Sequence, residues 1–85
     1  MSSMVIKKRR TVSAKALSAN LGVRILVLCG ERKWSQRQLA AEAGLDPGYI
    51  SRIVNGTVEP GLGTLGALAA AFGLDLGEFL KGLPL

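Results

Sequence analysis

The sequence predicts one compact all-α domain of five short helices. Its 85 residues are enough for one domain and too few for two. Hydrophobic residues make up 48% of the chain, too many for a disordered tail, and leucine and alanine, both strong helix formers, are abundant among them. Apolar residues recur at helical spacing, and glycines, prolines and capping residues separate these runs by short links, as in small helical domains.

The first helix is expected over about residues 18–31. One of its faces carries apolar residues at helical spacing, namely Leu17, Leu21, Ile25 and Leu28. Three further apolar residues lie off this face, namely Val23, Leu26 and Val27. Two explanations stay open for them: the helix is deeply packed, or it also contacts a partner subunit.

The second helix is expected to begin after Ser35 and to end near Ala43. Ser35 is followed three residues later by Gln38, which is the spacing of a capping box. Gly44 then ends the helix, because a glycine readily adopts the left-handed conformation that such an end requires.

The third helix is expected to begin at Pro47, with Asp46 as its N-cap. Proline suits the first helical position because its missing N–H would have no partner there. Ile50 and Ile53 are its inward residues, and Asn55 with the following glycine ends it.

The fourth helix is expected over about residues 62–72 and a short fifth one after Asp75. Inward residues of the fourth are Leu65, Leu68, Ala69 and Phe72. Three glycines at or near its start, Gly61, Gly63 and Gly66, indicate either close helix–helix approach or a weak first turn. Asp75 and Glu78 form a second capping-box pattern, and Leu76, Phe79 and Leu80 follow on the fifth helix.

The second and third helices have the spacing of a helix-turn-helix, over about residues 35–55. Counted from Gln36, the fifth position is Ala40, which is small because the next helix crosses close above it. The ninth is Gly44, where the turn needs a positive φ. Apolar residues fill the positions between the two helices: Leu39, Ala43, Leu45, Ile50 and Ile53. The steric demands of the motif are thus met over 20 residues.

On these residues the chain resembles the Cro/repressor (XRE-type) helix-turn-helix family. The segments that carry the resemblance are residues 35–44, 49–56 and 60, with matching positions over 64–80. It covers about residues 18–81. The resemblance implies a repressor-like DNA-binding domain of five helices, a second motif helix (the recognition helix) in the DNA major groove, and usually a homodimer on a palindromic operator.

The resemblance also assigns expected contacts to individual residues. Gln36 is expected to bind a DNA phosphate, or it is a plain helix-start residue. Asn55 is a second phosphate contact or a C-cap. The outer side of the recognition helix is expected to expose Pro47, Gly48, Tyr49, Ser51 and Arg52.

Arg52 is the expected base contact, since arginine can bind guanine O6 and N7 in a bidentate manner. It could instead bind a phosphate or an acid. Tyr49 is expected to stack on a sugar or to touch a thymine methyl, unless it is a partly buried packing residue, and Arg37 is a backbone contact or a solvated charge. Pro47 and Gly48 offer no side-chain donor where many family members have polar residues, so DNA shape and the N-terminal arm are expected to carry more of the recognition.

All of the net charge of +5 lies in residues 1–15, which contain no acid. We therefore divide the chain into a basic flexible arm, residues 1–15, and a near-neutral DNA-binding domain, residues 16–85. The arm contains four adjacent cations, Lys7, Lys8, Arg9 and Arg10. They are expected to enter a DNA groove or to bind phosphates without sequence specificity.

Composition excludes most other functions. The chain has no histidine and one cysteine, so zinc fingers, Ser-His-Asp triads and intrachain disulfides are ruled out. Neither a catalytic site nor a cofactor or metal is expected. No apolar stretch approaches a membrane span, and we expect a cytoplasmic protein that is nucleoid-associated when bound to DNA, with Cys29 reduced in the core.

The sequence thus predicts a double-stranded DNA-binding transcription regulator, a repressor or autoregulator that acts as a homodimer on a palindrome. The alternative is a DNA-binding antitoxin whose other surface neutralises a toxin. The off-face apolar residues of the first helix and the C-terminal residues 76–85 would serve a dimer or a toxin equally well.

Overall fold

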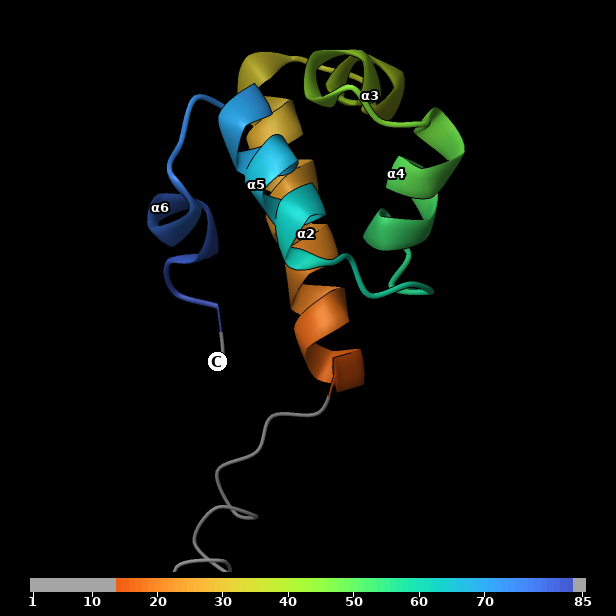
Figure 1. The fold of residues 1–85 in the computed structure, drawn as a ribbon, viewed down its shortest axis with the longest axis vertical. Helices are drawn as coiled ribbons and strands as arrows, with labels where there is room; N and C mark the ends of the chain where they lie inside the picture. The colour runs from red at the N-terminus through yellow and green to blue at the C-terminus, as the bar shows by residue number, and fades with distance from the viewer. Residues whose placement is uncertain (1–13, 84–85) are drawn as a thin grey trace, which may run out of the picture.

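The structure, a computed structural model, describes residues 14–83, which form five α-helices and no strand. The helices are α2 (Ala14–Arg32), α3 (Gln36–Ala43), α4 (Pro47–Val54), α5 (Leu62–Ala71) and α6 (Leu76–Leu80). The long helix α2 runs behind α5, while α3 and α4 lie on one side of this pair and α6 on the other (Figure 1). The prediction of an all-α, five-helix fold is confirmed.

Helix α2 begins earlier than the sequence pattern predicted, at Ala14 instead of near Ser18. The residues before Ser18 are two alanines, a lysine and a leucine, all of which favour a helix. Lys15, which we had grouped with the arm, therefore lies on α2, where it is exposed. The other helices begin and end within a residue or two of their expected positions.

Side-chain caps start three of the helices. The Ser35 hydroxyl accepts a hydrogen bond from the Gln38 N–H at 3.1 Å, and the Asp46 carboxylate caps α4 in the same way. Asp75 accepts from the Glu78 N–H at 2.7 Å, and the Glu78 carboxylate accepts from the Asp75 N–H at 2.9 Å. Of the two expected capping boxes, only the one that starts α6 has both halves among the described residues.

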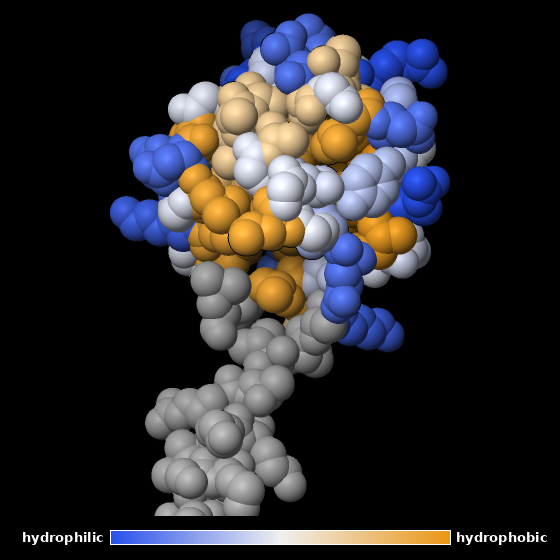
Figure 2. All heavy atoms as spheres, viewed as in Figure 1, coloured by the Kyte–Doolittle hydropathy of each residue, from blue (hydrophilic) through white to orange (hydrophobic). Residues whose placement is uncertain are grey.

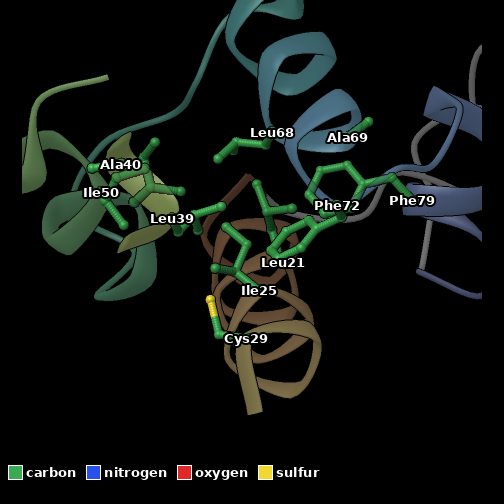
Figure 3. Packing of buried hydrophobic residues seen from close by; sticks show 11 residues of the cluster. Leu21, Ile25, Cys29, Leu39, Ala40, Ile50, Leu68, Ala69, Phe72 and Phe79 are labelled. Carbon is green, nitrogen blue, oxygen red and sulfur yellow. The ribbon is translucent and has the colours of Figure 1, made fainter. Parts of the chain in front are cut away.

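The buried core lies between α2 and the other four helices (Figure 3). It consists of Leu21, Ile25, Cys29, Leu39, Ala40, Ile50, Ile53, Leu68, Ala69, Phe72 and Phe79. Most of the residues predicted to point inward are among them. Four of the predicted inward residues are only half-buried, namely Leu17, Leu28, Ala43 and Leu65. The core thereby fixes α3 and α4 against α2.

Cys29 is a core residue with a free thiol, as expected. Burial raises the pKa of the Cys29 thiol above its ordinary value of 9.0, because the thiolate would lose its hydration, while the charge of nearby Arg32 partly offsets this rise. The thiol therefore stays protonated and acts as a small apolar side chain.

Two arginines of α2 hold the C-terminal ends of α5 and α6. Arg24 donates hydrogen bonds to the backbone carbonyls of Phe79 and Lys81, both at 2.7 Å. Arg32 donates to the carbonyl of Phe72 at 2.6 Å, and its guanidinium lies 5.1 Å from the centre of the Phe72 ring. These carbonyls have no partner within their own helix, so the two arginines stabilise the fold and are not free to bind a phosphate.

The off-face apolar residues of α2 remain exposed. Val23 is 60% exposed, Leu26 47% and Val27 50%. Deep packing is therefore the wrong explanation for them within residues 14–83. The described helices include none with the length and apolar character that crossing a membrane would demand.

The three glycines around the start of α5 do not mark a close helix–helix contact. A β-carbon added at Gly61, Gly63 or Gly66 would meet nothing within 4 Å. Gly61 is the N-cap of α5 and has no side chain with which to cap it. The alternative of a weak first turn fits this geometry, and the alternative of close approach is wrong.

Candidate nucleic-acid interface

The start of α3 presents the first candidate contact. Gln36 is the first residue of this helix and is half-buried, and its side chain makes no hydrogen bond within residues 14–83. Arg37 beside it is exposed and has no acidic partner in the same part of the chain. The first N–H groups of a helix lack partners within the helix and carry partial positive charge, so this end can receive a phosphate.

The turn between α3 and α4 has the geometry that the motif requires. Gly44 adopts the left-handed conformation with a φ of 70°, and the Leu45 N–H donates to the Ala40 carbonyl at 2.9 Å. Ala40 itself is 1% exposed. The roles predicted for the fifth and ninth positions of the motif, small size and positive φ, are thus confirmed.

Helix α4 is seated on α2 by a contact that sequence inspection missed. Gly22 of α2 lies so close to the backbone carbonyl of Val54 that a β-carbon would overlap this carbonyl. Ser18, one turn before Gly22, is buried as well. The pair of small residues one turn apart was the available signal, since such pairs let two helix backbones approach closely.

The outer side of α4 is less polar and less open than predicted. Four of the expected contact residues are exposed, namely Pro47, Gly48, Arg52 and Asn55. Tyr49 and Ser51, which we expected to be exposed, are half-buried. Arg52 is therefore the one charged side chain that α4 presents to solvent.

Tyr49 has a packing role in addition to any contact with DNA. Its ring packs against the core, and its hydroxyl lies 3.4 Å from the Thr64 hydroxyl on α5. The Arg52 guanidinium lies 5.8 Å from the centre of the Tyr49 ring, within the range of a cation–π contact. Tyr49 is therefore a partly buried packing residue, which is one of the two expected alternatives. Its ring also helps to orient Arg52.

The local structure explains why residue 48 is a glycine. A β-carbon at this position would lie 2.9 Å from the Asp46 Oδ2 atom, which caps α4 by accepting from the Tyr49 N–H at 3.2 Å. It would also lie 3.5 Å from Arg52 Nη1. A side chain at residue 48 would therefore disturb the N-cap, while its contact with the guanidinium would be an ordinary van der Waals one.

The end of α4 presents a free amide. Asn55 is the C-cap residue, and its N–H donates to the Ser51 carbonyl at 2.9 Å. Its exposed side chain makes no hydrogen bond within residues 14–83. The Arg52 carbonyl accepts from both the N–H and the hydroxyl of Thr57, at 3.0 and 3.1 Å. A C-cap and a phosphate contact are thus compatible at Asn55.

Arg37 of α3 and Arg52 of α4 are the cations of the two motif helices, and both are exposed. No aspartate or glutamate of residues 14–83 forms an ion pair with either arginine. In the same part of the chain, no three His, Cys, Asp or Glu side chains come together as a metal site would need. The predicted arm contacts, Lys7, Lys8, Arg9 and Arg10, lie outside the described residues.

Comparison with known proteins matches this geometry. A family model described as a helix-turn-helix matches residues 25–79 of the chain. A curated protein of Sinorhizobium fredii, named "Uncharacterized HTH-type transcriptional regulator y4dL", is 49% identical over 45 residues. The aligned part covers 53% of this chain and 23% of that protein, so the chain matches under a quarter of its relative's length.

Proposed function

The chain belongs to the XRE-type helix-turn-helix family of DNA-binding domains, and we propose that it regulates transcription by binding a specific double-stranded DNA sequence through α4. The observation that supports this most directly is which of its arginines have hydrogen-bond partners and which remain exposed. Arg24 and Arg32 are occupied by backbone carbonyls, whereas Arg52 is exposed on α4 and free of any acid within residues 14–83. A guanidinium that is oriented but unpaired suits a guanine in the major groove.

The remaining candidate residues surround this base contact. Gln36 and Asn55 bind phosphates at the start of α3 and the end of α4, and Arg37 binds the backbone or is solvated. Tyr49 touches a sugar or a thymine methyl with the exposed part of its ring. Because α4 offers few base-reading side chains, DNA shape and the basic arm contribute to the choice of site.

The regulator acts as a homodimer on a palindromic operator, as a repressor or autoregulator that blocks access to a promoter. Two copies related by a two-fold axis would place their α4 helices in successive major grooves, about 34–36 Å apart on one side of the DNA. We expect the protein in the cytoplasm, associated with the nucleoid when it is bound. The family is one of DNA-binding domains and not of enzymes, so we assign no catalytic activity.

An antitoxin is the second candidate function. The observation that favours it is the exposed apolar surface of α2 formed by Val23, Leu26 and Val27. A toxin that covers this surface would leave α4 free for DNA. Co-purification from the native host separates the two functions, because an antitoxin brings a small partner protein in stoichiometric amount.

Selection of bound fragments from random double-stranded DNA tests the main proposal. The expected result is an enriched inverted repeat whose half-sites contain a guanine, and Arg52→Ala is expected to lose the preference at that guanine. Enrichment of no sequence at all, with equal binding to every fragment, would refute sequence-specific regulation.

A further inference from the structure

Leu62 is an apolar side chain in an unusual place. It is the first residue of α5 and is 72% exposed, more than the other exposed large hydrophobic residues of the described chain. Figure 2 shows that hydrophobic residues cover much of the face on which α5 lies in front. Leaving this side chain in water forgoes the free energy that its burial would provide, which points to a surface that is covered in the working protein.

A hollow of about 270 Å³ is lined by residues on both sides of Leu62 in the sequence, Pro60 and Leu65. Its lining is mostly apolar and consists of Leu17, Ser18, Leu21, Glu59, Pro60, Leu65, Leu80 and Leu83. Leu65 lies three residues after Leu62 and therefore on the same side of α5, so we infer that the projecting side chain lies beside the hollow. Removing a buried leucine from a core leaves a cavity of about 150 Å³, so this hollow has room for one leucine side chain.

We propose that this surface joins two copies of the chain, with Leu62 of each copy inserted into the hollow of the other. A projection and a matching hollow side by side are what a two-fold contact requires, because both partners present the same surface. This inference deepens the proposed function, since it names the contact that makes the regulator a dimer.

The charges around the hollow are compatible with self-association. Lys15 and Glu59 line a second hollow that shares Ser18 and Glu59 with the first. The rim thus carries one charge of each sign, and a two-fold copy can set Lys15 near Glu59 of the partner subunit. A rim of a single sign would repel its own copy.

The size of the surface points to a weak dimer. Leu62, Lys15 and the eight lining residues make up ten residues per copy, about a third to a half of the 20–30 residues per side in a standard interface. We therefore expect a dimer that depends on concentration and that DNA stabilises.

The position of the surface fits an inverted-repeat operator. Glu59 and Pro60 follow closely after α4, which ends at Val54. A two-fold axis beside them therefore lies near both α4 helices, one in each copy, and relates their DNA contacts by the same symmetry.

Sedimentation equilibrium of the full chain without DNA tests this inference. Leu62→Ser is expected to raise the dimer dissociation constant by about a hundredfold or more, because each dimer loses two buried leucine contacts, each of which contributes a factor of about ten or more. The fold stays intact because the side chain is exposed. Val23→Ser, a similar change at a 60% exposed residue of α2, is the matched control and is expected to leave the constant unchanged.

A crosslink gives a second, independent readout. A mixture of the single variants Leu62→Cys and Leu83→Cys is expected to form disulfide-linked heterodimers on mild oxidation, while buried Cys29 does not react. The inference is overturned if the chain stays monomeric at its highest soluble concentration, if Val23→Ser is the variant that dissociates the dimer, or if the cysteine mixture fails to crosslink. It is overturned as well if Leu62→Ser dimerises as strongly as the parent chain. That result would mean that Leu62 is not at the dimer contact and that the hollow binds another protein or a small apolar molecule.

The outcomes for the dimer and for DNA binding are separable. A monomeric Leu62→Ser that still prefers a half-site through Arg52 at high protein concentration supports both proposals. If the dimer depends on Leu62 but binds every DNA sequence with equal affinity, this inference is supported and the proposed function is refuted.

Discussion

Gly22 of α2 lies against the backbone carbonyl of Val54, the last residue of α4, at a distance that admits no β-carbon. This contact sets how deeply the recognition helix sits on the domain. Because α4 carries Arg52 and Tyr49, the position of these two proposed DNA contacts depends on a buried glycine of another helix.

Gly22→Ala is expected to lower the free energy of unfolding by about 1–3 kcal/mol, because the added methyl group forces α4 away from α2. The same shift is expected to weaken DNA binding. Urea unfolding and a binding titration measure the two effects. Gly30→Ala in the same helix is the control: a β-carbon there meets nothing within 4 Å, so the change is expected to stabilise the fold by about 0.5–1 kcal/mol. Equal effects of the two substitutions would argue against a close contact at Gly22.

Arg52→Ala is expected to cost about 1–3 kcal/mol of binding free energy on the selected DNA site and to relax the preference at one base pair. Titration of the selected site and of random DNA at the same salt concentration measures this. Lys81→Ala removes one exposed charge directly after α6, the helix that lies on the other side of the α2–α5 pair from α4 (Figure 1), and is expected to leave the preference unchanged. If Arg52→Ala weakens binding equally on both DNAs, Arg52 binds a phosphate and does not identify a base.

Deletion of residues 1–12 removes four adjacent cations and is expected to reduce the salt dependence of DNA binding. Each phosphate contact contributes about 0.9 to the slope of log K against log salt, so the loss of Lys7, Lys8, Arg9 and Arg10 is expected to lower its magnitude by about three to four. Titrations at several salt concentrations give the slope. An unchanged slope would mean that the arm makes no contact with the DNA backbone.

The stability of the fold is expected to fall at alkaline pH because of Cys29. Burial raises the pKa of this thiol in the folded protein above the ordinary value of 9.0, so the folded state keeps a proton that the unfolded state has already lost. The contribution of the thiol to stability is complete below pH 9.0 and is lost as the pH rises through the folded-state pKa. Urea unfolding at pH 7 to 10 measures this. Cys29→Ala is the control, and its difference in stability from the parent chain should narrow with rising pH; a constant difference would contradict a raised pKa.

The local signals in the sequence were sufficient for the helix-turn-helix. Ser35, Asp46 and Asp75 each start a helix by accepting a hydrogen bond from the backbone N–H three residues later. Gly44 ends a helix because it adopts a positive φ. The inward positions of α4, Ile50 and Ile53, followed from their spacing alone. The start of α2 was placed too late because helix propensity without an apolar face leaves the first turn undefined.

By itself, then, the sequence determined the helices, their caps, the motif and the location of the net charge, since each depends on residues within one or two turns of one another. Only the tertiary structure decided what the residues do between helices. Arg24 meets the Phe79 carbonyl from 55 positions away, and Tyr49 turns partly inward towards α5. The contact of Gly22 with α4 and the hollow beside Leu62 likewise arise from backbones that meet only in the folded chain. A backbone carbonyl or a cavity has no side-chain signature of its own. The small residues Ser18 and Gly22 one turn apart indicate that some backbone approaches α2 there, but they do not identify which one.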